Sequence, residues 1–139
     1  MDTWNNLSTM FFEQADRLGD KPFLWEKQNG VYEAVSWNEA AQRACAIANG
    51  LLAHGIKPGD RVVLVSENRP EWLITEIAVL SIGAILVPAY TTNTVDDHAH
   101  ILMDSGAKAA LVSTNRLAVP LLAAARKSPA RSSGKLSAS

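Results

Sequence analysis

The sequence has few of the features that mark a secreted, membrane-spanning or disulfide-stabilised protein. Its single cysteine, Cys45, excludes an internal disulfide. The longest apolar run, at 84–89, is far too short to cross a bilayer. The first residues also lack the basic segment and apolar block of a secretory signal. We therefore expect a reduced, cytoplasmic protein with no transmembrane segment.

Net charge is almost absent too, but its distribution along the chain is uneven. The 139 residues carry a formal charge of −1. There are 14 acidic and 7 basic residues through Asp104, and 6 basic and no acidic residues after it. A basic end segment can bind nucleic acid. Here the basic residues are spaced apart and lack interleaved aromatic residues, so we expect no nucleic-acid partner.

Glycine is missing where a nucleotide-binding loop would need it. A dinucleotide site places glycines after the first parallel strand, so that backbone N–H groups can approach the pyrophosphate. After the strand expected at 61–66, the sequence continues Glu67-Asn68-Arg69-Pro70, which has no glycine and carries a carboxylate that repels phosphate. This composition argues against dinucleotide binding at that strand end.

Clustered metal ligands and catalytic groups are also scarce. Asp96, Asp97, His98 and His100 are close in sequence, but no distant third ligand accompanies them, so the pattern favours a solvated helix face. No nucleophile, base and orienting group occur together, and a small buried thiol is the expected state of Cys45. We expect no metal site and no catalytic residue in this chain.

Apolar spacing and turn residues predict alternating helices and strands. Asn29-Gly30 favours a tight hairpin turn, Ser36 with Glu39 forms a capping-box pattern, and Thr94 with Asp97 marks another helix start. The expected elements are a helix at 3–18, strands at 23–26 and 31–36, a helix from 36–39 to Gly55, a strand at 61–66, a helix from near Pro70 to Gly83, a strand at 84–88, a helix from Thr94 to 105–106, a strand at 109–113 and a helix at 117–127.

This order predicts the fold class and the domain limits. Strands that alternate with helices from 61 to 127 indicate parallel pairing with right-handed crossovers. We therefore predict a three-layer α/β fold, a parallel βαβαβα unit preceded by a helix and a β-hairpin, over residues 1–127. Residues 128–139 contain five serines, one leucine and no periodicity, so we predict a disordered or non-native tail there.

Three stretches then follow one another at a specific spacing: SWNEAAQRACAIANGLLAHGIKPGDRV (36–62), SENRPEWLITEIAVLSIGAILVPAY (66–90) and HILMDSGAKAALVS (100–113). Together they resemble the N-terminal part of the adenylate-forming (AMP-binding) acyl-CoA synthetase family. The combination of NRPEW with VPAYTTNT is most similar to bacterial long-chain fatty acid–CoA ligases. The resemblance covers roughly residues 8–125.

The resemblance implies a two-step reaction in the intact enzyme. ATP and a fatty acid give an acyl-adenylate and pyrophosphate, and coenzyme A then displaces AMP to give the thioester, with Mg²⁺ offsetting the phosphate charge. The family's Ser/Thr/Gly-rich phosphate loop, its adenine and ribose motifs and its C-terminal lysine have no counterpart here. We therefore expect an N-terminal fragment that is inactive alone, binds no cofactor and contributes no catalytic residue.

One segment is the candidate for contact with the fatty acid substrate. Tyr90, Thr91, Thr92 and Asn93 follow the strand at 84–88, and ligands of open α/β sheets collect outside the carboxyl ends of strands. We interpret these four residues as substrate-channel candidates. A stand-alone, non-catalytic α/β binding or interaction module remains the alternative. Peripheral membrane contact and oligomeric state are left open by the sequence.

Overall fold

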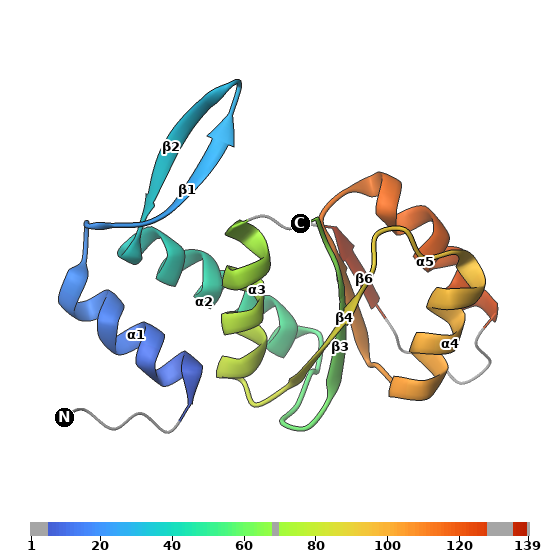
Figure 1. The fold of residues 1–139 in the computed structure, drawn as a ribbon. Helices are drawn as coiled ribbons and strands as arrows, with labels where there is room; N and C mark the ends of the chain where they lie inside the picture. Colours follow the sequence, from blue (N-terminus) through green and yellow to red (C-terminus); the bar gives the residue numbers. More distant parts are fainter. Residues whose placement is uncertain (1–5, 68–69, 128–134, 139) are drawn as a thin grey trace. The chain divides into compact units, whose positions relative to one another are not determined.

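The computed structural model describes residues 6–67, 70–127 and 135–138, and the chain divides into two units. One unit, here called the helical unit, comprises residues 1–53 and 68–82; the other, the sheet unit, comprises residues 54–67 and 83–139. Figure 1 labels their helices and strands. No helix in the described ranges is long and apolar enough to cross a membrane.

The helical unit packs helices around a core of aromatic and small side chains. Its elements are α1 (Leu7–Leu18), β1 (Pro22–Gln28), β2 (Val31–Ser36), α2 (Trp37–Ala53) and α3 (Pro70–Ser81). Alanines at helical spacing on α2 let the neighbouring helices approach closely. The buried residues of this core are Phe11, Val35, Ala40, Ala44, Ala48, Ile74, Ile77 and Ala78.

The hairpin of β1 and β2 has the turn that the sequence predicts. Asn29 and Gly30 both adopt positive φ angles, 51° and 82°, as a two-residue turn between antiparallel strands requires. The pairing shifts register between Pro22 and Leu24. At that irregularity Phe23 stacks on Trp37, with ring centroids 4.1 Å apart, which ties the base of the hairpin to α2.

The sheet unit contains the parallel strands. Its elements are β3 (Arg61–Val65), β4 (Ile85–Ala89), α4 (Val95–Ser105), β5 (Ala109–Val112), α5 (Asn115–Lys127) and β6 (Lys135–Ala138). The strand order is β4-β3-β5-β6, and each pairing is parallel; parallel pairing was predicted for β3, β4 and β5. Val63, Val65, Ala110 and Val112 contribute one face of the strands to a buried cluster that also contains Leu102 of α4 and Leu121 of α5.

Side-chain caps set several helix ends. The Thr94 side chain accepts the Asp97 N–H at 3.2 Å, and the Asp97 carboxylate accepts the Thr94 N–H at 2.9 Å, so a capping box forms at the helix start predicted there. Helix α5 begins two residues before its predicted start, because Thr114 accepts the Leu117 N–H at 3.3 Å. Asn6 caps α1, and residues 3–5 of the helix predicted at 3–18 lie outside the described residues.

Two expectations differ from the structure. Lys135–Ala138 forms strand β6 beside β5, where we expected no regular structure, because the backbone of an edge strand can pair with a segment of almost any composition. Residues 128–134 and 139 of the predicted tail lie outside the described residues, so its non-native origin stays a prediction. Cys45 is exposed rather than buried, since it lies off the buried alanine stripe of α2.

Candidate functional site

The carboxyl ends of the parallel strands converge on one edge of the sheet unit. Val65 of β3 pairs with Ala89 of β4 and with Val112 of β5, so the residues that follow these strands begin at the same edge. The Ser113 N–H donates to the Val65 carbonyl at 3.1 Å and extends this alignment by one residue. We call residues 66–67, 90–93 and 113–116 the carboxyl edge. In open α/β sheets this is where ligands bind.

The predicted channel residues form a turn at the carboxyl edge. The Asn93 N–H donates to the Tyr90 carbonyl at 3.2 Å and closes the turn just before the cap of α4. The Tyr90 side chain is 79% exposed, Thr92 is exposed, and Thr91 and Asn93 are half-buried. A free aromatic ring beside hydroxyl and amide groups can contact both an apolar chain and a polar head group. Their role in a substrate channel stays a prediction.

Sequence reasoning did not assign four further polar residues of the carboxyl edge: Ser66, Glu67, Ser113 and Arg116. Ser66 is buried, and its hydroxyl donates to the Glu67 carbonyl at 3.0 Å. The Ser113 hydroxyl is buried without a hydrogen-bond partner. The Arg116 guanidinium lies 3.4 Å from the Glu67 carboxylate. The position of Ser66, Glu67 and Ser113 at or just after the predicted strand ends was a usable signal, whereas Arg116 lies between a predicted strand and a helix predicted to start at 117.

The chemistry of the carboxyl edge suits binding rather than nucleophilic catalysis. An activated serine needs a base within hydrogen-bonding reach. Neither Ser66 nor Ser113 has an imidazole or carboxylate partner. The Glu67 carboxylate lies beside a guanidinium, and such a pair on an exposed surface contributes little to stability. The edge therefore offers hydroxyl, amide and aromatic contacts without an assembled catalytic group.

The acidic and histidine residues of α4 do not assemble a metal site. Three of them contact different partners: Asp97 caps the helix, Asp96 lies 3.2 Å from Lys127, and His100 lies 3.4 Å from Asp104. The Thr94 backbone N–H holds the pKa of Asp97 below its usual range. Across the described ranges, no group of three or more His, Cys, Asp or Glu residues could hold a metal ion.

His98 departs from the solvated face that the sequence pattern favoured. Asp96, Asp97 and His100 are exposed, but His98 is only 1% exposed, and its Nδ1 has no hydrogen-bond partner. Burial lowers the pKa of the imidazole, against a smaller opposing effect of the Asp97 charge. The ring is therefore neutral at neutral pH. Helix periodicity explains its burial, since His98 shares a face with the core residue Leu102.

A family model described as "AMP-binding enzyme" matches residues 11–138. The chain belongs to this family. The match spans the hairpin, α2, α3, the parallel sheet and the carboxyl edge, and it confirms the family that the sequence blocks indicated. In this AMP-binding family member, the described residues gather no group of three or more His, Cys, Asp or Glu that could hold a metal ion.

Two individual relatives support the same family assignment. Over 103 residues the chain is 37% identical to the long-chain-fatty-acid–CoA ligase FadD15 of Mycobacterium tuberculosis, an alignment that covers 74% of this chain and 17% of FadD15. Human acyl-coenzyme A synthetase ACSM5 is 31% identical over 114 residues, or 81% of this chain and 19% of that protein. The chain therefore spans less than a fifth of the length of these relatives.

Solved structures show the same fold. A benzoate CoA ligase from Burkholderia xenovorans LB400 superposes with a TM-score of 0.82 at 21% identity, over 98% of this chain and 26% of that one. At this identity the likeness concerns the fold alone. The mixed α/β architecture with a parallel sheet, predicted from the order of elements, is thereby confirmed.

Proposed function

We propose that this chain is the N-terminal part of an ATP-dependent long-chain fatty acid–CoA ligase and that it contributes substrate-binding surface rather than catalytic groups. The 37% identity to FadD15 over 103 residues is the observation that carries the proposal. The similarity of NRPEW and VPAYTTNT to long-chain ligases supports the same substrate class. The intact enzyme would convert a fatty acid to its acyl-adenylate and then to the coenzyme A thioester.

Within that enzyme, we assign the turn from Tyr90 to Asn93 to the wall of the fatty-acid channel. The turn lies at the carboxyl edge, and its exposed aromatic ring provides apolar contact area beside polar groups.

The segment after β3 does not suit the phosphates of ATP, and the described residues do not suit Mg²⁺. The segment after β3 has no glycine to admit a phosphate chain, and Glu67 already lies beside Arg116. Across the described residues no metal-ligating group forms. We therefore assign ATP, Mg²⁺ and coenzyme A to other parts of the intact enzyme, and we expect the isolated chain to be inactive.

A chimaeric enzyme tests the substrate assignment. The segment of FadD15 that aligns with this chain is replaced by the corresponding residues of this chain, and acyl-CoA formation is measured with long-chain fatty acids and with benzoate. We expect activity with a preference for long chains. In the same chimaera, Tyr90→Ala should raise the KM for the fatty acid by roughly 3- to 10-fold and leave the KM for ATP unchanged. Met103→Ala, which alters an exposed position on α4, is the control.

Other results would contradict parts of the proposal. A chimaera that prefers benzoate would overturn the substrate class, and equal effects of the Tyr90 and Met103 substitutions would remove the turn from the channel. Fatty-acid-dependent exchange of pyrophosphate into ATP by the purified chain would overturn the expected inactivity of the isolated chain.

Reading the source DNA beyond codon 127 in all three frames tests whether the tail is non-native. A stop codon with unrelated DNA beyond it, together with saturable partner binding, would favour the stand-alone module.

A further inference from the structure

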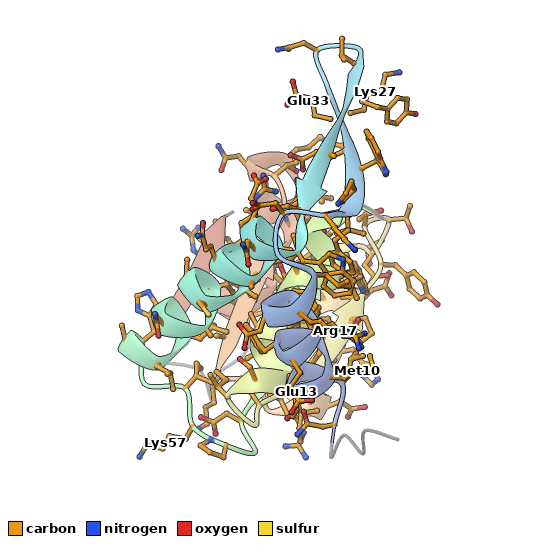
Figure 2. The ribbon with its side chains drawn as sticks, turned by 90° about the vertical axis from the view of Figure 1, so that its left-hand side faces the viewer. Met10, Glu13, Arg17, Lys27, Glu33 and Lys57 are labelled. Carbon is orange, nitrogen blue, oxygen red and sulfur yellow. The ribbon has the colours of Figure 1, made fainter. Side chains whose placement is uncertain are left out.

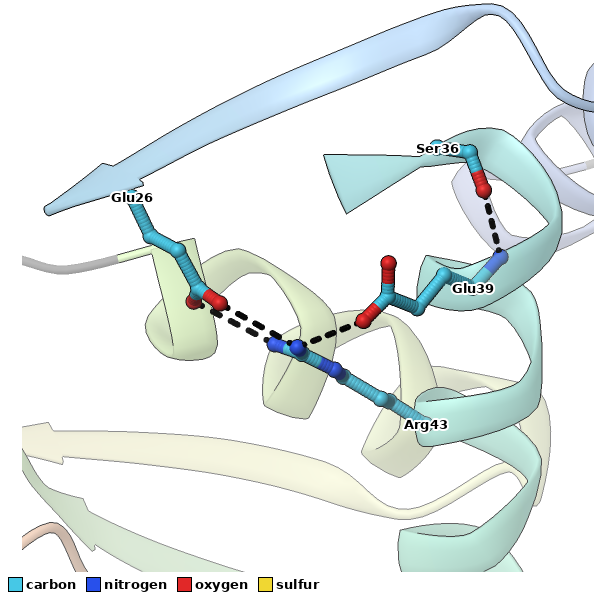
Figure 3. Close-up of polar contacts among 4 residues, drawn as sticks. All are labelled: Glu26, Ser36, Glu39 and Arg43. Atoms are coloured by element: carbon cyan, nitrogen blue, oxygen red, sulfur yellow. Dashed lines mark hydrogen bonds and ion pairs between the residues drawn. The ribbon is translucent and has the colours of Figure 1, made fainter. Parts of the chain in front are cut away.

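Near its base, the hairpin of β1 and β2 has one face that is held against its own unit, whereas Glu33 and Val31 farther along that face are exposed. Val35 on this face is 1% exposed and belongs to the core of the helical unit. Glu26 lies on the same face, and both of its carboxylate oxygens accept hydrogen bonds from the Arg43 guanidinium of α2, at 3.2 and 3.3 Å (Figure 3). We call this the inner face. Its contacts fix which side of the hairpin is left uncovered.

The opposite side, which we call the open face, presents aromatic side chains to solvent. Cross-strand pairs place Trp25 opposite Ala34 and Lys27 opposite Tyr32, and directly opposed residues share a face of the sheet. Trp25 is 60% exposed and Tyr32 is 66% exposed. The Lys27 ammonium lies 5.8 Å from the centroid of the Tyr32 ring. Two large, exposed aromatic side chains and a lysine thus share one face of the hairpin.

Charge is separated between the two faces. Glu26 pairs with Glu33 across the strands, so both carboxylates of the hairpin project on the inner side, whereas Lys27 projects on the open side. Figure 2 shows Lys27 and Glu33 on opposite sides of the hairpin. The open face is therefore cationic as well as aromatic, and a complementary partner must be anionic and able to accept apolar rings.

We propose that the open face of the hairpin binds the surface of an anionic phospholipid bilayer. Tryptophan and tyrosine rings settle at the level of lipid head groups, where one end of the ring is apolar and the other is hydrated. Lysine extends an apolar stem along such a surface while its ammonium meets the lipid phosphates. The open face provides this combination through Trp25, Tyr32 and Lys27, independently of the reaction proposed above.

Vesicle flotation tests this inference. The purified chain is mixed with vesicles of phosphatidylcholine and phosphatidylglycerol in equal amounts and centrifuged through a density gradient, in which aggregated protein sinks and bound protein rises. We expect the chain to float. Trp25→Ala with Tyr32→Ala should reduce the partition coefficient about 10-fold or more, because two interfacial rings are lost. Leu52→Ala with Met103→Ala, which removes exposed apolar side chains elsewhere, should leave flotation unchanged.

Two further variants separate the contributions and do not depend on the fold tolerating the double alanine change. Lys27→Glu should weaken flotation with the anionic vesicles and much less with pure phosphatidylcholine, and added salt should have the same selective effect. Trp25→Phe keeps an aromatic ring. It should therefore retain flotation but remove a component of tryptophan emission that brominated lipid quenches in the unaltered chain.

Several results would overturn the inference. Absence of flotation is one, and equal flotation of the double alanine variant and its control is another. A self-associated chain that becomes monomeric when Trp25 and Tyr32 are replaced, and that ignores vesicles, would instead identify the open face as a contact between copies.

Discussion

His98 carries a titratable ring in surroundings that oppose its charge. Because burial lowers its pKa from the ordinary value of 6.5, the unfolded chain binds a proton more readily than the folded chain. The free energy of unfolding is therefore highest, as far as His98 is concerned, above about pH 6.5, where the ring is neutral in both states. It decreases progressively as the pH falls below that value. His98→Leu should flatten this pH dependence, and urea midpoints measured by circular dichroism from about pH 7 to pH 5 test it.

The same substitution removes the unpartnered Nδ1 atom, so we expect stability at neutral pH to be unchanged or raised by up to about 1 kcal/mol. His100→Leu is the control, because the His100 side chain is 76% exposed, and its replacement should leave the acid sensitivity in place. A pH profile unaffected by His98→Leu would show that another group governs acid stability.

Gly83 is constrained by its backbone and by its neighbour. It has a φ of +77°, and a Cβ built on it would lie 3.2 Å from the Cβ of Pro58. Gly55 has a φ of +86° with nothing within 4 Å. We expect Gly55→Ala to cost about 1–2 kcal/mol from backbone strain alone and Gly83→Ala to cost more. Native-state hydrogen exchange of the β3 amides measures the loss of stability in each variant. Equal losses in the two variants would contradict the close approach of Gly83 to Pro58.

At the scale of elements, Arg43 anchors the hairpin to α2. Glu26 and Glu33 oppose each other across the strands, a repulsive arrangement that the guanidinium offsets, and Glu26 in turn raises the pKa of Arg43. Because the Glu26 side chain is only 9% exposed, Arg43→Met should destabilise the hairpin by about 1–3 kcal/mol. Faster hydrogen exchange confined to β1 and β2 is the expected signature.

A matched change at Arg17 controls for the loss of a charge. The Arg17 guanidinium donates a hydrogen bond to the Gln14 side chain within α1, so Arg17→Met should leave exchange in the hairpin unaltered. Uniform acceleration across the helical unit after Arg43→Met would mean that the ion pair supports the unit as a whole rather than the hairpin.

At the scale of the whole molecule, the described cores fall into two sets, one in each unit. The cluster around Phe11 and Ile74 belongs to the helical unit, and the cluster around Val63 and Leu121 belongs to the sheet unit. All four tryptophans fall in the residue ranges of the helical unit. Urea unfolding followed by tryptophan fluorescence should therefore not coincide with unfolding followed by circular dichroism. Superimposable transitions would show that the units unfold together.

We also expect the isolated chain to fold weakly and to aggregate. β4 is an edge strand of the described sheet, and its Ile85 is 46% exposed, which invites pairing with other chains. Light scattering during thermal unfolding measures this tendency. A soluble monomer with a sharp, reversible melt would contradict the expectation.

The sequence by itself determined the local elements and the family of this protein. The Asn29-Gly30 turn, the helix start at Thr94 and the alternation of strand and helix all depend on neighbours within a few residues, and each appears in the structure where the sequence placed it. The turn from Tyr90 to Asn93 was also placed after its strand, because position along the chain is enough for that inference.

Only the tertiary structure decided what depends on distant residues. The strand order β4-β3-β5-β6 brings Ser66 and Ser113 to the edge that Tyr90 shares, and chain order does not contain that information. The strand at Lys135–Ala138 and the face of the hairpin that stays open likewise result from pairing and packing between elements rather than from preferences within one element. Short-range steric and capping preferences fix an element, whereas long-range contacts fix which of its faces and edges remain available.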